Sequence, residues 1–127
     1  MGIPMVLAFN LEESALQTLQ RLCTDLEIRC KSVPPEGFSL SIGTMVGIPV
    51  MVATSRTGEN FTEPMLIMCN LNEAQFNAFL QGLRYSSIPR IDLKAVLTPT
   101  NVAWNAIQLH EELSRERDAV RRAERKK

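Results

Sequence analysis

The chain has 127 residues, 45% of them hydrophobic and 22% charged, a composition typical of one globular domain in water. Its 14 Lys and Arg side chains balance 14 Asp and Glu side chains, so the formal net charge is zero. A neutral chain has no overall field that attracts nucleic acid or an anionic membrane surface, and we expect neither as a partner.

Three cysteines, Cys23, Cys30 and Cys69, cannot all pair with one another, and neither a CxxC motif nor a Cys/His cluster accompanies them. The sequence therefore predicts neither a disulfide framework nor a zinc site. Reduced thiols are typical of the cytoplasm, which is the location we expect. The apolar start MGIPMVLAF lacks Lys and Arg and is too short to cross a bilayer, so we expect neither a signal peptide nor a membrane span.

An internal repeat organises the chain. Residues 4–13, PMVLAFNLEE, share Pro, Met, Asn, Leu and Glu with residues 64–73, PMLIMCNLNE. The repeat predicts two halves of one domain, 1–127, each built as strand, helix, strand and second helix. We place these halves at 4–47 and 64–113, with a linker at 48–63 and a charged helical tail at 114–127.

Four mainly apolar segments have the length of strands. In chain order they are Met5–Phe9, residues 28–33, Met65–Cys69 and residues 91–97. Pro34 and Pro35 end the second one, because proline cannot join the hydrogen bonds of a sheet. A short helix or turn is expected at 36–47, and residues 50–53 are a candidate for an extra strand before a polar loop.

Two asparagines are placed to cap the helices that follow the first and third strands. Asn10 precedes Glu13, and Asn70 precedes Glu73, each at the spacing of a capping box. Apolar residues at helical spacing then define the buried faces. These are Leu16, Leu19, Cys23 and Leu26 in the first helix, and Phe76, Phe79, Leu80 and Leu83 in the second.

The last strand runs into the last helix through a Thr-Pro-Thr-Asn corner. Thr98 is a suitable N-cap, and Pro99 then occupies the first helical position, where its missing N–H costs nothing. The free amides of such a first turn attract anions, so Thr98 and Asn101 are candidate ligand-binding residues; the alternative is that they only cap the helix. The expected buried face of this helix is Val102, Ala106, Leu109 and Leu113.

Strands that alternate with helices indicate an α/β fold, here a small, doubly wound, mainly parallel sheet with helices on both faces. A pseudo-twofold axis between the halves would place the first and third strands at the centre, in the order 2-1-3-4. Lys31 and Lys94 support this order, because a lysine inside a strand suits a sheet edge.

Ligands bind such sheets beyond the carboxyl ends of the central strands. We therefore expect Asn10 and Asn70 to face each other there and to bind a small molecule or anion, although both could be plain helix caps. No glycine-rich loop follows either strand, so no nucleotide fingerprint is present. His110, the only histidine, has no nucleophile or acid at triad spacing, and Cys69 is better explained as a buried apolar residue, so no catalytic residue, metal or cofactor is predicted.

Two segments, PMLIMCNLNEAQFNAFLQGLR at 64–84 and LKAVLTPTNVAWNAIQLHEEL at 93–113, resemble a bacterial family known only as a domain of unknown function. The resemblance rests on residues 93–98, Asn101, Trp104 and the Leu/Glu-rich last helix. It implies a small cytoplasmic α/β protein and carries no established activity, cofactor or catalytic residue.

Two classes of function remain open. The first is a non-enzymatic binding or regulatory module that associates with itself or with a partner protein, for which the mixed charges of residues 114–127 and Val120 and Ala123 suggest a helix–helix contact. The second is a small-molecule or anion-binding protein, with or without enzymatic activity, that uses Asn10, Asn70, Thr98 and Asn101.

Overall fold

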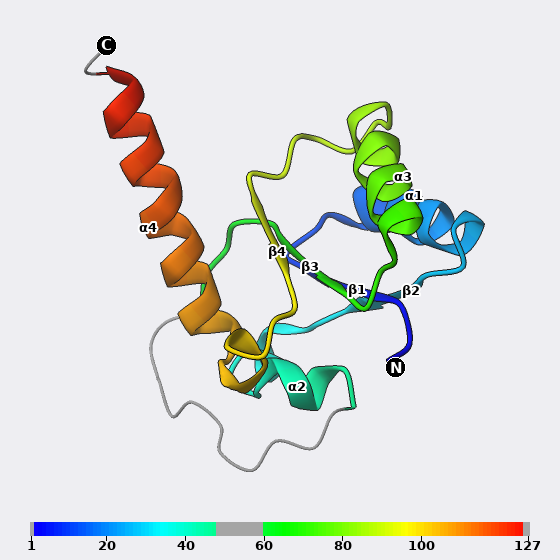
Figure 1. Ribbon diagram of the computed structural model, residues 1–127, viewed down its shortest axis with the longest axis horizontal. Helices are drawn as coiled ribbons and strands as arrows, with labels where there is room; N and C mark the ends of the chain where they lie inside the picture. Colours follow the sequence, from blue (N-terminus) through cyan, green and yellow to red (C-terminus); the bar gives the residue numbers. More distant parts are fainter. Residues whose placement is uncertain (1, 48–59, 126–127) are drawn as a thin grey trace. The chain divides into compact units, whose positions relative to one another are not determined.

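The computed structural model describes residues 2–47 and 60–125, which form two compact units. One unit contains residues 2–34 and 62–97 and holds the sheet (Figure 1). The other contains residues 35–47, 60–61 and 98–125. The candidate strand at 50–53 lies outside the described residues. The unit boundaries do not follow the two expected halves, because each unit draws on both of them.

The sheet has four strands in the order β2-β1-β3-β4, which confirms the α/β class and the predicted order 2-1-3-4. They are β1 (Met5–Phe9), β2 (Arg29–Ser32), β3 (Met65–Cys69) and β4 (Leu93–Val96). The central strands β1 and β3 carry no charge, and all of β3 is buried, as expected for strands between two neighbours. Lys31 and Lys94 lie in the two outer strands, where lysine discourages further strand pairing.

The direction of the central pair differs from the expectation. β1 is parallel to β2, and β3 is parallel to β4, but β1 and β3 are antiparallel, with Met5 opposite Cys69 and Phe9 opposite Met65. Alternation of strand and helix requires parallel pairing only within each strand–helix–strand unit. The described part of the segment between β2 and β3 contains η1 and α2 and lies mainly in the other unit, so this rule does not fix the direction in which the chain enters β3.

Helices α1 (Glu13–Asp25) and α3 (Glu73–Arg84) lie side by side on one face of the sheet, as Figure 1 shows. We expected helices on both faces, but within this unit the two helices share one core with one face of β1 and β3. The helices approach closely at Gly82, where an added β-carbon would stand 2.5 Å from Leu22 Cδ1. A larger residue at Gly82 would therefore require the Leu22 side chain to shift. The shared core consists of Val6, Ala8, Ala15, Leu19, Cys23, Ile28, Leu66, Met68, Phe79, Ile88 and Ile91.

Asn10 and Asn70 are turn residues and not helix caps, so the predicted capping role is wrong. Both have φ of 61°, a left-handed conformation that asparagine adopts more readily than most residues. Asn10 Nδ2 donates to the Glu63 carbonyl at 3.1 Å, and Asn70 Nδ2 donates to the Ile3 carbonyl at 3.2 Å. Each asparagine thus ties the end of one central strand to the segment that leads into the other.

The helix caps lie two residues further along the chain. The N-cap of α1 is Glu12, whose side chain makes no capping bond. The N-cap of α3 is Asn72, whose Oδ1 accepts from Gln75 N at 2.7 Å while Gln75 Oε1 accepts from Asn72 N at 3.1 Å. This reciprocal pair is the capping box that the sequence predicted, formed by residues two positions later than expected.

The second unit is held together by a short backbone ladder and a stack of rings. Its helices are α2 (Ile42–Met45) and α4 (Ala106–Arg125), with single turns η1 (Pro35–Gly37) and η2 (Asn101–Ala103). Ile42 N donates to the Trp104 carbonyl at 2.8 Å, and Ala106 N donates to the Phe38 carbonyl at 3.1 Å. The Phe61 ring stacks on Phe38 at 4.7 Å and on His110 at 4.3 Å between centroids. None of the helices in the described residues is long and apolar enough to cross a membrane.

The first prediction concerns the left-handed turn at Asn10. The change Asn10→Ala removes the bond to the Glu63 carbonyl and replaces asparagine by a residue that adopts the left-handed conformation less readily, so we expect a loss of about 2 kcal/mol in the free energy of unfolding. Asn10→Gly keeps the conformation accessible and loses only the bond, about 1 kcal/mol. Urea denaturation measures both values.

Asn77→Ala is the matched control, because Asn77 is exposed on α3 and its change is expected to stay within about 0.5 kcal/mol of the wild type. An Asn10→Ala protein as stable as this control would contradict the turn role of Asn10.

Candidate functional site

The structure separates the two asparagines that were expected to form a site. Because β1 and β3 are antiparallel, Asn10 after β1 and Asn70 after β3 lie at opposite ends of the strands. The expectation that they face each other across a crevice is therefore wrong. Each side-chain amide instead donates to a backbone carbonyl, of Glu63 and Ile3 respectively. A ligand-binding role for either residue stays a prediction.

Thr98 and Asn101 lie together in the other unit and form a reciprocal pair. Thr98 Oγ1 accepts from Asn101 N at 3.0 Å, and Asn101 Oδ1 accepts from Thr98 N at 2.9 Å. The Thr98 hydroxyl thus accepts from an amide of the next turn, as expected, but the last helix does not begin at Pro99 and Thr98 is not its N-cap. The turn η2 ends at Ala103, and α4 begins afresh at Ala106 with its own cap, in which Asn105 Oδ1 accepts from Gln108 N at 2.9 Å. A single turn lacks the aligned amides of a long helix, which weakens the expected attraction for an anion.

His110 and Cys69 are in environments that suit packing. The His110 ring lies parallel to Phe61, with 6° between the ring planes, and its Nε2 stands 3.4 Å from Ser114 Oγ on the next turn of α4. Cys69 is fully buried in β3, and burial raises the pKa of its thiol to about 12, so it stays uncharged at neutral pH. In the part of the chain that the structure describes, no group of three or more His, Cys, Asp and Glu could hold a metal ion.

A pocket that the sequence interpretation did not foresee lies within the sheet unit, beside α3 and the outer strand β4. Its volume is about 580 Å³, within the range of small-molecule sites in proteins. The lining combines an apolar surface with three cationic side chains. The apolar residues are Leu80, Leu83, Ile88, Pro89 and Ile91, and the cationic residues are Arg84, Arg90 and Lys94. We call this cavity the α3–β4 pocket.

Strand register explains why the pocket forms there. Lys94 is paired with Leu66 and Val96 with Met68, and both partners belong to the core that faces α1 and α3. Lys94 and Val96 therefore stand on the helix-covered face of the sheet. At the outer strand this cover is incomplete, since Val96 is 47% exposed and Lys94 is exposed as well. The pocket occupies the uncovered part of this face.

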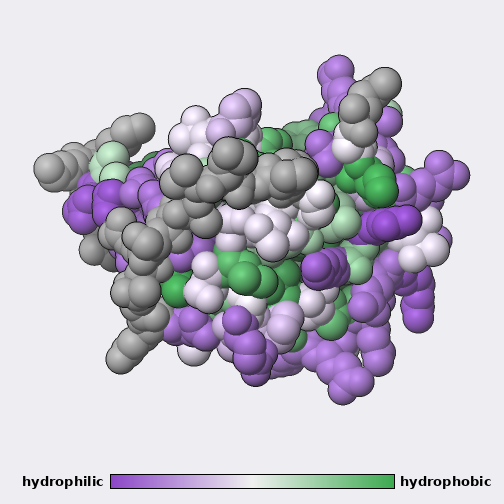
Figure 2. Space-filling model, turned by 90° about the horizontal axis from the view of Figure 1, so that it is seen from below, coloured by the Kyte–Doolittle hydropathy of each residue, from purple (hydrophilic) through white to green (hydrophobic). Residues whose placement is uncertain are grey.

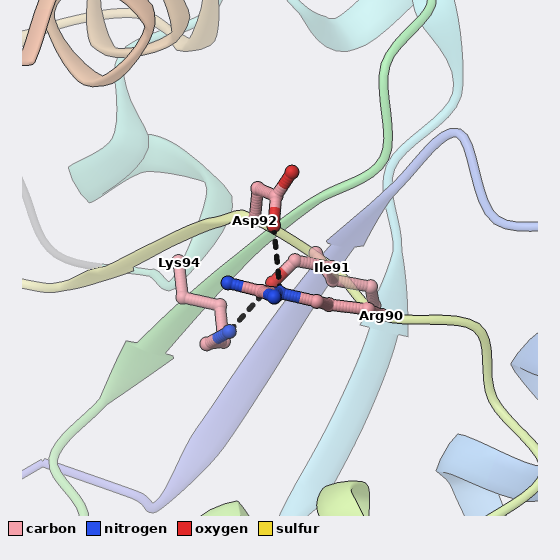
Figure 3. A network of polar contacts seen from close by, with 4 residues as sticks. All are labelled: Arg90, Ile91, Asp92 and Lys94. Atoms are coloured by element: carbon pink, nitrogen blue, oxygen red, sulfur yellow. Dashed lines mark hydrogen bonds and ion pairs between the residues drawn. The ribbon is translucent and has the colours of Figure 1, made fainter. Parts of the chain in front are cut away.

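Two of the three cationic side chains, Arg90 and Lys94, make polar contacts with neighbouring residues at the rim (Figure 3). Lys94 Nζ donates to the Ile91 carbonyl at 2.5 Å, and Arg90 Nε pairs with Asp92 Oδ1 at 3.0 Å. An ammonium group has three donors, so Lys94 keeps two for a ligand. Arg90 is 91% exposed at its side chain, so its pair with Asp92 is weakly held. Three cations beside one carboxylate leave an excess of positive charge at the mouth of the pocket.

The sequence does contain a pattern that corresponds to this pocket, a group of cationic residues close to apolar ones. Residues 84–94 carry Arg84, Arg90 and Lys94 between apolar residues. Lys94 was assigned to edge protection, which the structure supports through its place in β4, but the same side chain also lines the pocket. Recognising the pocket from sequence would have required the turn after α3 to be placed against β4.

Residues 64–120 match the model of a family described as a domain of unknown function, DUF3783. The matched segment includes β3, α3, β4 and η2, and therefore every residue that lines the α3–β4 pocket. This agrees with the resemblance to an uncharacterised domain. No curated protein and no solved structure matches the chain. The function of the protein is accordingly unknown.

The second prediction tests the capping role of Thr98. The change Thr98→Ala leaves the Asn101 amide without its side-chain acceptor, so we expect a loss of about 1 kcal/mol in unfolding free energy. Thr98→Ser retains the hydroxyl and should lose much less. Urea denaturation of the two variants decides the point, and equal stability of Thr98→Ala and Thr98→Ser would refute it.

Proposed function

We propose that the protein is a non-enzymatic binding module that holds a small molecule with an apolar body and one anionic head in the α3–β4 pocket. The observation that supports this most is the composition of the lining, five apolar side chains next to three cations. An apolar pocket with a few convergent polar groups is the usual form of a small-ligand site.

The apolar surface supports the body of the ligand. Leu80 and Leu83 come from α3, and Ile88 and Ile91 from the segment between α3 and β4. Ile88 and Ile91 also belong to the core of the sheet unit, so they are held in place by packing. Burying an apolar chain against such a surface contributes about 25 cal/mol per Å². On the face drawn in Figure 2, hydrophobic side chains lie in small groups among hydrophilic ones.

The cationic rim supports the choice of an anionic head. Arg84 stands in the last turn of α3, Arg90 in the following segment, and Lys94 in β4, so three separate elements direct positive charge to one cavity. A guanidinium group presents paired donors that match a carboxylate or a phosphate. The lining residues do not favour a carboxylate over a phosphate. The proposal therefore includes both head groups, and the binding experiment below distinguishes them.

Three further expectations remain part of the proposal. The free thiols of Cys23, Cys30 and Cys69 fit a reducing cytoplasm. A bacterial origin rests on the family resemblance alone. Self-association stays a prediction, for which the exposed Val120 on α4 offers a point of contact.

The third prediction uses decanoate, decyl phosphate and decanol as probes, with isothermal titration calorimetry of the full chain. We expect at least one of the two anions to bind with a negative heat-capacity change, and decanol to bind more weakly because it lacks the charge. The stronger of the two anions identifies the head group. The change Lys94→Gln should weaken the preferred anion about tenfold, which corresponds to the loss of one charge-assisted hydrogen bond.

Lys31→Gln is the matched control, because Lys31 occupies the other outer strand and is paired with Leu7, which is not part of the helix-side core. We expect this variant to bind like the wild type. The absence of binding by both anions, or equal weakening by Lys31→Gln and Lys94→Gln, would overturn the proposed function.

A further inference from the structure

Two cysteines that are seven positions apart in the chain meet between α1 and β2. Cys23 lies in the last turn of α1 and is fully buried, whereas Cys30 lies in the outer strand β2 and is partly exposed. Strand register pairs Cys30 with Val6, so its side chain stands on the face that α1 covers. There Cys30 packs against the core cluster that contains Cys23, and the interaction between the two side chains shifts the pKa of each thiol.

The turn between the two cysteines is held in place by backbone bonds. Ile28 N donates to the Cys23 carbonyl at 2.8 Å, and Glu27 adopts a left-handed φ of 60° that reverses the chain. Gln75 Nε2, from the start of α3, donates to the Leu26 carbonyl at 3.1 Å. The fold therefore places Cys23 and Cys30 on the same face of the sheet and fixes the turn that joins them.

The environment gives the two thiols different roles. Hydrogen bonding from Cys23 lowers the pKa of Cys30, because the donated S–H stabilises the Cys30 thiolate. The same bond, together with burial, raises the pKa of Cys23, which therefore remains a protonated donor. The reactivity of a thiol increases with the fraction present as thiolate and with solvent access to the sulfur. Cys30 has the lower pKa and is the more exposed of the two, so it is the attacking group.

We propose that Cys23 and Cys30 form a peroxide-sensitive dithiol, a modification site in which Cys30 is oxidised first and Cys23 then closes an intrachain disulfide. The Cys30 thiolate attacks one oxygen of hydrogen peroxide, the O–O bond breaks, and Cys30 becomes a sulfenic acid with release of hydroxide. Cys23 sulfur attacks Cys30 Sγ, the S–O bond breaks, and the departing hydroxide takes the Cys23 proton to leave as water. Two thiols lose two electrons in total, and one peroxide is reduced to water.

The test begins with the reduced full-length protein, which is exposed to hydrogen peroxide, treated with catalase, denatured and labelled with N-ethylmaleimide. Intact mass spectrometry counts the labels. We expect three labels before oxidation and one after it, on Cys69. Tryptic digestion should then show residues 22–29 joined to residues 30–31, a pair that separates on reduction.

Cys69→Ser is the matched control, and it should form the same disulfide and retain no label after oxidation. Three labels on the oxidised wild type would overturn the proposal. So would a Cys30 sulfinic acid with Cys23 still labelled, a bridge that includes Cys69, or a bridge between two chains.

A second measurement tests the contact between the thiols without requiring oxidation. The rate of Cys30 alkylation by iodoacetamide rises with pH as the thiolate forms, and in the wild type the midpoint should lie below that of an ordinary thiol. Cys23→Ala removes the donor, so the midpoint should move to higher pH and alkylation at neutral pH should slow. Cys23→Ser keeps a donor and should restore part of the shift. An unchanged profile in Cys23→Ala would show that the pair does not act together.

Discussion

The antiparallel pairing of β1 with β3 is the constraint from which the rest of the sheet unit follows. Each of these strands starts a strand–helix–strand unit with a parallel second strand, and nearly all such crossovers are right-handed. Two right-handed crossovers that start from antiparallel neighbours and run outward place both helices on the same face, and α1 and α3 indeed share one core. Parallel central strands would have sent the helices to opposite faces. The same pairing places Asn10 and Asn70 at opposite ends of the sheet, so no site between them can form.

The bounds of the two central strands could be predicted, whereas the outer strands β2 and β4 are shorter than the predicted 28–33 and 91–97, and strand direction could not be predicted. β1 and β3 have the bounds that the apolar runs indicated, because each run begins after a proline and ends at an asparagine. A strand that is buried on both faces has the same apolar pattern whether its neighbour is parallel or antiparallel. The helix starts were misplaced for a related reason. Asparagine is favoured both as an N-cap and in the left-handed conformation, and the residue type alone does not tell these uses apart at Asn10 and Asn70.

The candidate site was missed because its residues each had a sufficient local explanation. Lys94 suits an edge strand, Arg84 suits the end of a helix, and Ile88 and Ile91 suit a core, as they do in the structure. Only the tertiary arrangement brings them around one cavity. The relation between Cys23 and Cys30 was missed for a similar reason. Three cysteines cannot all pair, but two of them can still lie near each other, and only the fold places Cys30 against the core that contains Cys23. At Thr98 the sequence predicted the acceptor role of the hydroxyl correctly, because that bond depends on neighbours in sequence, but the helix expected to begin at Pro99 starts only at Ala106.

The most direct test of where this protein binds a ligand is a two-dimensional amide NMR titration with decanoate and decyl phosphate. The account predicts shifts concentrated in residues 80–94, which line the pocket beside α3 and β4, with little change near Asn10, Asn70 or Thr98. Shifts centred on Asn10, Asn70 or Thr98 would instead place the ligand at the strand ends or at the Thr-Pro-Thr-Asn turn, and would contradict the account. A spectrum that neither compound changes would contradict it as well.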